Sequence, residues 1–531
     1  MLFLISLATL ILVAAIHGQD QIGGPGGPQS GSVAGARGGQ GFGAIPTPPP
    51  PKSLFPNAKP VRSCESLASV SLPNTTIESA AVDPNNSAIC RVNAFTTHPP
   101  TGDKVRIWIG IPTASWNGRF MGTGGGGFSG GSAMGINQPL AQGYAAGATD
   151  TGHEGMSGSF ALGADGRLNW QLIRDNGHLG IHEMTVIGKA LTEAMYGVAP
   201  KYSYFNGCST GGRQGLMEAQ RYPQDYDGIV SGAPAINWQK LHPQQLWGPV
   251  IMNAMANPVP GCKLTAATAA AVTACDLIDG VKDNVIGDPK RCHYDPKQLI
   301  GASAGESCGS FTEVDATVIQ KLWEGPRRQD GSFLWYGLPK GADLNALWTS
   351  KGTQPQVMGI TLDWFRYFLA EDPKLDGNAI TRDQYERFWD QSIEQYSAVI
   401  GTDDPDLTDF RNRGGKAIVW HGWADQLISA EGTIDYYSRV QKQMGGPEKT
   451  SQFIRLFMAP GVGHCGGGNG PSPSGQQEAL LEWVEKGKSP ETLPATSRDW
   501  SRPLCRYPLV AKYKGTGSTH DAAKFACSNG F

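Results

Sequence analysis

The chain has 531 residues, of which 17% are charged, and its formal net charge at pH 7 is −3. Such a weak and balanced charge gives no electrostatic case for nucleic acid or an anionic membrane surface as a partner. The ten cysteines are an even number, spread along the chain without paired C-x-x-C ligands, which favours disulfides over zinc sites.

The first 60 residues contain two segments that are not expected to join a folded core. Residues 1–16 form an apolar run too short for a comfortable membrane span, and small and polar residues follow it. We interpret residues 1–19 as a signal peptide, although no Lys or Arg precedes the apolar run, so a retained anchor stays open as an alternative. Residues 20–60 are rich in Gly and Pro and are predicted to be a disordered linker. These segments predict a secreted protein, extracellular or periplasmic, with no membrane partner after signal cleavage.

A glycine-rich loop follows an early predicted strand, at residues 121–127. A loop of this kind can supply a backbone N–H to a developing oxyanion. The rival interpretation is a phosphate-binding loop. It fails because neither a Walker Lys-Ser/Thr pair nor the Rossmann spacing with a distal acid follows.

Residues 207–212 contain G-x-S-x-G, directly after a predicted strand at 202–205 and before a predicted helix at 214–220. Glycines on both sides of a serine let the chain turn sharply from strand to helix, so that the hydroxyl stands exposed as in a nucleophile elbow. The motif alone is weak evidence, because 71 of the 531 residues are glycine. We predict Ser209 as the nucleophile and the Thr210 N–H as one donor of the oxyanion hole.

The other two members of a catalytic triad follow in the order Ser, Asp, His that α/β-hydrolases use. A predicted strand at 416–422 ends shortly before Asp425, and a predicted strand at 453–458 runs into a glycine-rich loop with His464. A serine hydroxyl is a poor nucleophile, so an imidazole must take its proton and a buried carboxylate must fix the imidazole tautomer. We predict Asp425 as the orienting carboxylate and His464 as the base.

Two cysteines adjoin this triad, because Cys208 directly precedes the serine and Cys465 directly follows the histidine. A disulfide between them would tie the base to the nucleophile, and the alternative is two unrelated structural cysteines. The Cys-Ser, Asp, His-Cys arrangement resembles the tannase and feruloyl esterase family of α/β-hydrolases. Longer stretches resemble that family too, at residues 116–120, 148–153, 207–215 and 226–234. The resemblance covers roughly residues 64–527.

The predicted fold is therefore α/β, an α/β-hydrolase fold with a large inserted lid domain. The interval between Ser209 and Asp425 far exceeds the roughly 60 to 80 residues that two strand-helix units need, so an insertion must fill it. We assign residues 61–235 and 413–531 to the catalytic domain. Residues 236–412 would form the lid, above the carboxyl ends of the strands, where such folds bind ligands.

Inside the lid, the residue pattern predicts helices at 264–274 and 314–323. We interpret the aromatic cluster at 364–368 as lid core in preference to a substrate contact. An acidic turn at 276–285 holds three carboxylates around a glycine, and such hard oxygen ligands suit calcium, although the EF-hand pattern is absent. On these residues alone, a solvated acidic turn is an equal alternative.

The family resemblance adds residue roles that the pattern alone does not give. It implies a structural Ca²⁺ held by the side chains of Asp276, Asp279 and Asp283 and by the backbone carbonyls of Val281 and Val285. It implies Gly125 as the second oxyanion donor, with the neighbouring glycines as alternatives in register. It implies the disulfides Cys64–Cys90, Cys208–Cys465, Cys275–Cys292 and Cys505–Cys527, which leave Cys262 and Cys308 as a fifth pair.

The resemblance implies a secreted serine carboxylesterase that hydrolyses esters of aromatic acids through an acyl-enzyme. The family includes feruloyl esterases, tannases and mono(2-hydroxyethyl) terephthalate hydrolases. Terephthalate-ester hydrolases place a lid arginine on the substrate's free carboxylate, and Gln356 stands near that position here, so a charged terephthalate lacks its partner. We expect feruloyl-type hydroxycinnamate esters first and galloyl esters second, with plant polysaccharide or tannin as the carrier. A catalytically silent ligand-binding homologue is the alternative from a different class.

Overall fold

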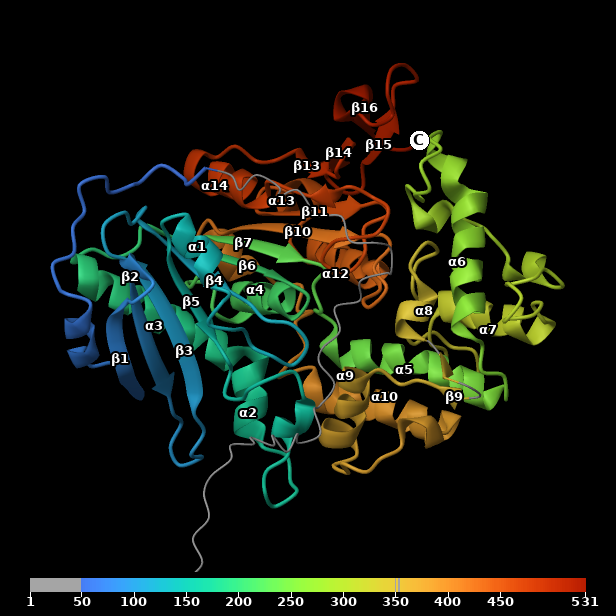
Figure 1. The fold of residues 1–531 in the computed structure, drawn as a ribbon, viewed down its shortest axis with the longest axis horizontal. Coiled ribbons are helices and arrows are strands. Elements are labelled where there is room, and N and C mark those ends of the chain that lie inside the picture. The colour runs from blue at the N-terminus through green and yellow to red at the C-terminus, as the bar shows by residue number, and fades with distance from the viewer. Residues whose placement is uncertain (1–48, 349, 352–353) are drawn as a thin grey trace, which may run out of the picture. The chain divides into compact units, whose positions relative to one another are not determined.

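A nine-stranded mixed sheet organises the fold (Figure 1). The structure is a computed structural model that describes residues 49–348, 350–351 and 354–531, so the predicted signal peptide and the predicted linker up to residue 48 lie outside it. The strands of the large sheet are β1 (Thr75–Asp83), β2 (Asn86–Thr96), β3 (Val105–Pro112), β4 (Arg119–Thr123), β5 (Ala145–Thr149), β6 (Tyr202–Cys208), β7 (Gly228–Gly232), β10 (Lys416–Gly422) and β11 (Ile454–Ala459). Their order is β1-β2-β3-β5-β4-β6-β7-β10-β11. The pairs from β1 to β5 are antiparallel, and those from β5 through β4 to β11 are parallel.

The parallel strands β7, β10 and β11 are buried on both faces, which explains their sequences. Every residue of β7 and β11 is buried, and β10 is buried after its first residue. Near-continuous apolar runs are typical of strands that helices cover on both sides. The strands predicted at 202–205, 416–422 and 453–458 fall on β6, β10 and β11 to within a few residues.

Helices cover both faces of this sheet and confirm the predicted α/β fold. On one face, α3 (Gly180–Tyr196), α4 (Thr210–Arg221) and α12 (Ala430–Gln443) pack with Phe205 in one hydrophobic cluster. On the other face, α1 (Asn137–Ala141) and α14 (Gln476–Lys486) pack with Tyr204 in a second cluster. Tyr204 and Phe205 are neighbours on β6, so their side chains point to opposite layers, as strand geometry requires. The remaining short helices of this part are α2 (Trp170–Arg174), a π-helical turn (Asp175–Leu179), α13 (Pro447–Thr450) and the 3₁₀ turns Glu65–Ser69, Gly158–Ala161 and Ala522–Lys524.

The chain between β7 and β10 forms the inserted segment, which is mostly helical (Figure 1). Its elements are α5 (Trp238–Ala254), α6 (Gly261–Cys275), α7 (Glu313–Glu324), α8 (Leu344–Leu347), β8 (Ser350–Lys351), β9 (Gln354–Pro355), α9 (Gly359–Asp363), a π-helical turn (Trp364–Leu369), α10 (Arg382–Tyr396), α11 (Thr408–Asn412) and the 3₁₀ turns Asp276–Asp279, Pro289–Arg291, Pro296–Leu299 and Gly377–Ala379. The helices predicted at 264–274 and 314–323 lie within α6 and α7. Trp364, Phe365 and Phe368 are fully buried in a hydrophobic cluster of this segment, as expected for lid core. The exact domain boundaries stay a prediction.

One helix of the lid, Gly261–Asp279, is long and apolar enough to cross a membrane by length and composition. Its Leu264 and Ala267 are nevertheless fully buried in the lid cluster. Cys262 and Cys275 join it to neighbouring loops through disulfides. These contacts fix the helix to the rest of the lid.

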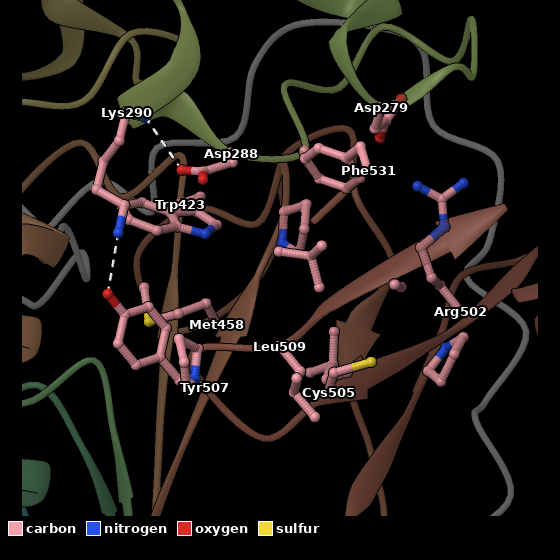
Figure 2. A pocket seen from close by; sticks show the side chains of 17 residues that line it. Asp279, Asp288, Lys290, Trp423, Met458, Arg502, Cys505, Tyr507, Leu509 and Phe531 are labelled. Atoms are coloured by element: carbon pink, nitrogen blue, oxygen red, sulfur yellow. Dashed lines mark hydrogen bonds between the residues drawn. The ribbon is translucent and has the colours of Figure 1, made fainter. Parts of the chain in front are cut away.

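The C-terminal region fastens the lid to the sheet. It contains β12 (Ser472–Pro473), β13 (Thr492–Thr496), β14 (Ser501–Cys505), β15 (Val510–Tyr513) and β16 (Phe525–Ser528). Figure 2 shows the pocket at this junction, where Lys290 of the lid donates a hydrogen bond of 2.9 Å to the Tyr507 hydroxyl. The same ammonium group lies 5.7 Å from the ring centroid of Trp423, two residues before Asp425. This contact therefore braces the loop that carries the predicted catalytic carboxylate.

All ten cysteines form disulfides, in the five pairs that the sequence analysis predicts. The pairs are Cys64–Cys90, Cys208–Cys465, Cys262–Cys308, Cys275–Cys292 and Cys505–Cys527. Such a complement is typical of proteins that fold in an oxidising compartment.

The predicted disordered linker, which was expected to run to Pro60, is wrong for its last residues. The Leu54 N–H donates to the Asn117 carbonyl at 3.0 Å, and the Phe55 ring lies 5.7 Å from the Trp116 ring. The average composition of this segment is dominated by Gly and Pro and does not reflect these two apolar residues, which contact residues of the sheet domain. Residues 53–60 therefore belong to the folded part of the chain.

Candidate active site

Ser209 lies at the junction of β6 and α4 in the conformation of a nucleophile elbow. Its φ of 62° and ψ of −122° place a non-glycine residue in an unfavourable backbone region. Such strain costs about 1–3 kcal/mol and is typical of functional sites. A Cβ at Gly207 would come within 2.5 Å of the Gly211 backbone, so the turn requires glycine there. The Ser209 N–H donates to the Gly232 carbonyl at 3.0 Å, which holds the turn against the end of β7.

Asp425, which is fully buried, and His464, whose side chain is 12% exposed, form a hydrogen-bonded pair beyond the ends of β10 and β11. His464 Nδ1 lies 2.8 Å from Asp425 Oδ2, and Asp425 Oδ1 accepts the N–H groups of Leu427 (2.8 Å) and Ile428 (2.9 Å). Burial alone would raise the pKa of Asp425, but the charge of His464 and hydrogen bonds from His421 and His464 hold that pKa well below its usual range. Burial opposes charge on His464 as well, yet Asp425 raises the His464 pKa above its ordinary value. The pair therefore has the electrostatics of a general base with its orienting carboxylate.

His421 is a further polar residue at this site, and the motif analysis gave it no role. It is fully buried on β10, with Nε2 3.1 Å from Asp425 Oδ2 and Nδ1 2.8 Å from the Thr433 hydroxyl. His421 and His464 thus share one carboxylate oxygen, so Asp425 is positioned from two sides. The signal in the sequence is the i, i+4 spacing of His421 and Asp425, which is too common to identify a site.

The Cys208–Cys465 disulfide places the serine next to the histidine. It joins the residue directly before Ser209 to the residue directly after His464, and its Cα atoms are 5.9 Å apart. Among the described residues, His464 hydrogen-bonds to Asp425 and Gln426, and the Ser209 hydroxyl makes no hydrogen bond to it. Such catalytic hydrogen bonds are often long before substrate binds. The fold thus gathers the three predicted triad residues, with the Asp–His contact already formed.

The glycine-rich loop after β4 lies against the N-terminus of α4, where the Gly211 N–H donates to the Gly125 carbonyl at 3.0 Å. The Gly125 N–H itself donates to the Gln214 side chain at 3.0 Å. It is therefore engaged, which speaks against the expectation that Gly125 is the second oxyanion donor. The next N–H, that of Gly126, has no acceptor in the part of the chain that the structure describes, and the same holds for Thr210. Gly126 also faces open space, since no atom lies within 4 Å of a Cβ built there.

The lid contacts this loop directly. A Cβ built on Gly127 would lie 3.1 Å from Ile360 Cδ1, at the start of α9. Asp363, at the end of α9, accepts hydrogen bonds from the Ser157 hydroxyl (2.9 Å) and the Gly158 N–H (2.8 Å). Gln356 precedes α9 by three residues, so it belongs to the lid segment that approaches the glycine-rich loop.

The acidic turn predicted to bind calcium is held by backbone hydrogen bonds. Asp276 Oδ1 accepts the N–H groups of Asp283 (3.0 Å) and Val285 (3.3 Å), and both Asp276 and Asp279 are buried. Burial raises the pKa of Asp279 to about 6 and also raises the pKa of Asp283. Arg502 pairs with Asp283 at 2.8 Å. Asp276 and Asp279 have no Lys or Arg within ion-pair distance among the described residues, so the turn keeps a net negative charge, which a hard divalent cation would neutralise.

Comparisons with known proteins agree with this geometry. The family model described as tannase and feruloyl esterase matches residues 90–528. A probable feruloyl esterase from Arthroderma benhamiae is 38% identical over 484 residues, which cover 87% of this chain and 88% of that protein. Feruloyl esterase B from Aspergillus niger is 31% identical over 83% of this chain and 86% of its own length.

Solved structures show the same likeness over nearly the whole chain. Feruloyl esterase B from Aspergillus oryzae has a TM-score of 0.76 at 25% identity, covering 88% of this chain and 100% of that one. Tannin acyl hydrolase from Aspergillus niger has a TM-score of 0.78 at 25% identity, covering 90% and 96%. The protein is a carboxylic ester hydrolase, and it belongs to the tannase and feruloyl esterase family.

Proposed function

We propose that the protein is a secreted serine esterase that hydrolyses feruloyl-type esters through an acyl-enzyme. The observation that carries the mechanism is the hydrogen-bonded Asp425–His464 pair, tied by a disulfide to the strained elbow of Ser209. The feruloyl esterases among its relatives support the choice of substrate. The five disulfides support an oxidising location outside the cytosol.

In the proposed reaction, His464 Nε2 takes the hydroxyl proton of Ser209 while the serine oxygen attacks the ester carbonyl. Nε2 is the nitrogen left to act as the base, because His464 Nδ1 is bonded to Asp425. The carbonyl oxygen becomes an oxyanion, which the N–H groups of Thr210 and Gly126 would receive. The tetrahedral intermediate then releases the alcohol, which takes the proton from His464, and the aromatic acyl group stays on Ser209. A water molecule repeats the sequence and releases the aromatic acid.

Gln356 bears on which ester is preferred. It lies in the lid segment whose Ile360 approaches the glycine-rich loop. An amide cannot form the bidentate ion pair that an arginine forms with a free carboxylate. Neutral hydroxycinnamate esters on plant polysaccharide therefore rank above the charged terephthalate monoester. Galloyl esters of tannins are the second candidate, which the likeness to a tannin acyl hydrolase favours.

We also propose a structural calcium ion in the lid, as a support for the fold and not for the chemistry. Its ligands would be the side chains of Asp276, Asp279 and Asp283 and the backbone carbonyls of Val281 and Val285. When bound, the ion would supply positive charge to a turn that holds three carboxylates. The Cys275–Cys292 disulfide brackets the same turn, so cation and disulfide would brace one loop together.

A three-substrate panel tests the proposed function. The values of kcat/KM for methyl ferulate, methyl gallate and mono(2-hydroxyethyl) terephthalate are compared, with Ser209→Ala as the inactive control. Methyl ferulate should give the highest value. A higher value for methyl gallate would make the protein a tannase, and binding of methyl ferulate without turnover would make it a ligand-binding homologue. Gln356→Arg should raise turnover of the terephthalate ester relative to methyl ferulate, and an unchanged ratio would refute the role given to this position.

A further inference from the structure

A second cluster of polar side chains, made of residues outside the triad, lies where the β2–β3 hairpin meets the helices that follow β5 (Figure 1). His98 and Asp103 come from the hairpin, and Asp175 is the first residue of the π-helical turn. One potential ligand atom of each of these three residues lies within 4.8 Å of the other two. His98 Nδ1 is 2.6 Å from Asp103 Oδ2 and 3.7 Å from Asp175 Oδ1.

The cluster carries more negative than positive charge. Within the described residues, Asp103, Asp175 and Glu183 have no Lys or Arg within ion-pair distance, and His98 is their shared partner. Even a protonated imidazole cannot neutralise three carboxylates. This balance distinguishes the cluster from an ordinary buried salt bridge.

Asp175 supplies an independent sign that a partner is missing from this cluster. Its side chain is fully buried, and its Oδ2 has no hydrogen-bond partner among the described residues. Its Oδ1 accepts a hydrogen bond of 2.8 Å from the Gln171 amide. A buried, unpaired carboxylate oxygen is costly and rare, so it calls for a bound ion, a proton or an ordered water.

The other two candidate ligands are held by outer partners that leave one atom of each facing the cluster. His98 Nε2 lies 2.8 Å from Glu183 Oε1, and the Thr96 hydroxyl donates to the other oxygen of that glutamate at 2.7 Å. The Thr101 hydroxyl donates to Asp103 Oδ1 at 2.6 Å, which leaves Asp103 Oδ2 toward His98 Nδ1. Metal-binding histidines characteristically donate their second ring N–H to a carboxylate, and metal-binding carboxylates are hydrogen-bonded in turn.

We propose that His98, Asp103 and Asp175 bind one divalent transition-metal ion of the Zn²⁺ type, oriented by Glu183 behind the imidazole. One imidazole nitrogen and two carboxylate oxygens suit such an ion better than Ca²⁺, which prefers an all-oxygen shell. The ion would replace the proton between His98 and Asp103 and would place a positive charge beside the buried Asp175 carboxylate, whose Oδ1 lies 3.7 Å from His98 Nδ1. The His98 side chain is 18% exposed, so the cluster can be reached from solvent.

The ion would brace a segment that supports the active site. In the π-helical turn that begins at Asp175, the Asn176 amide donates to the Phe128 carbonyl at 2.8 Å, directly after the glycine-rich loop. Arg213 of α4 donates to the carbonyls of Asn176 (3.0 Å) and Gly177 (2.6 Å). The turn therefore contacts both the residue that follows the glycine-rich loop and helix α4, which begins directly after Ser209. π-Helical turns are frequent at functional sites. The role assigned to the ion is structural, with no step in ester hydrolysis.

The test is Zn²⁺ binding by the full-length protein in saturating Ca²⁺, which keeps any lid site filled. Calorimetry and metal analysis after gel filtration should show one Zn²⁺ equivalent in the wild type that is absent from His98→Gln and Asp175→Asn. Zn²⁺ should raise the Tm of the wild type and not of these variants. Glu183→Gln keeps all three ligands and should weaken binding about 10- to 100-fold. If the buried Asp175→Asn fails to fold by circular dichroism, the partly exposed His98→Gln carries the test.

His182→Gln is the matched control, because His182, Glu218 and Asp225 form another histidine–carboxylate group. Glu218 of this group also has buried oxygens without a hydrogen-bond partner among the described residues, but Lys189, 4.0 Å from Asp225, supplies the countercharge that the first cluster lacks. This variant should therefore keep the Zn²⁺ equivalent. Equal Zn²⁺ binding by the wild type and His98→Gln would overturn the proposal. Loss of Zn²⁺ binding in His182→Gln alone would overturn it as well. Absence of bound Zn²⁺ in the wild type would also overturn it and would leave a shared proton as the content of the cluster.

Discussion

Removing the Cys208–Cys465 disulfide, by Cys208→Ala with Cys465→Ala, separates its effect on stability from its effect on the position of the catalytic base. The bridge closes an interval of 257 residues. The chain-entropy model gives about 5.5 kcal/mol for a loop of this size, while native disulfides usually contribute about 2–5 kcal/mol. We therefore expect a large drop in Tm, and activity must be expressed per folded molecule.

The loss in kcat should exceed the loss in folded protein. The disulfide joins two strained turns, because φ is 62° at Ser209 and 59° at Cys465. Without the bridge, the loop carrying His464 can relax away from the elbow while it keeps its hydrogen bond to Asp425. A displacement of about 1 Å can cost roughly 100-fold in rate, so kcat should fall about 10- to 100-fold, with a smaller change in KM.

The assay is kcat for methyl ferulate well below Tm, with circular dichroism on the same samples. Cys64→Ala with Cys90→Ala is the matched control, because it removes a bridge of separation 26 between the start of the first 3₁₀ turn and β2. The control should lower Tm and leave kcat unchanged. A folded Cys208/Cys465 double variant with wild-type kcat would show that the bridge only adds stability, and the positioning argument would be wrong.

Four further changes test individual parts of the site. Ser209→Ala should reduce ester hydrolysis by several orders of magnitude with an unchanged circular dichroism spectrum, and more than a few per cent residual activity would contradict its role. Asp425→Asn should lower kcat about 10⁴-fold. Because Asp425 raises the His464 pKa and only the neutral imidazole is a base, the acid limb of the pH profile should also move to lower pH in this variant. An acid limb at the same pH as in the wild type would refute this coupling. Gln214→Leu removes the acceptor of the Gly125 N–H in the glycine-rich loop and should lower kcat more than it changes KM. A change in KM alone would assign this side chain to substrate binding. Asp279→Asn should lower Tm and leave kcat intact below Tm, so immediate loss of turnover in a folded variant would indicate a catalytic metal.

The parts of the fold that could be predicted from sequence are those with strong local signals. Strands β10 and β11 were recognisable because a parallel strand covered on both faces is almost uniformly apolar, and β6 was recognisable by its aromatic residues directly before the elbow. The elbow was recognisable because Gly207 packs too closely on Gly211 for any side chain. The end of the linker was misplaced because composition averages over Leu54 and Phe55, whose partners come from the tertiary fold.

The parts of the site that could not be predicted depend on contacts between distant segments. Four consecutive glycines carry the same local signal, so nothing in their own sequence tells which N–H is free. Which glycine N–H stays free depends on Gln214, which lies 89 residues further along the chain and accepts the hydrogen bond of the Gly125 N–H. His421 is a similar case, because only the folded structure shows that it and His464 share one oxygen of Asp425.

The position of the lid in the sequence explains why the triad needs cross-links. The inserted segment separates Ser209 from both Asp425 and His464, so the nucleophile and its base come from opposite ends of a long interval. The structure ties these ends covalently, through Cys208–Cys465, and ties the Asp425 loop to the lid non-covalently, through the contacts of Lys290. A change in the lid can therefore alter the wall of the site near the glycine-rich loop without moving His464 relative to Ser209. The lid residues that face the substrate can thus change while the arrangement of the triad stays the same. This gives a physical reason why one triad can be combined with lids of different specificity.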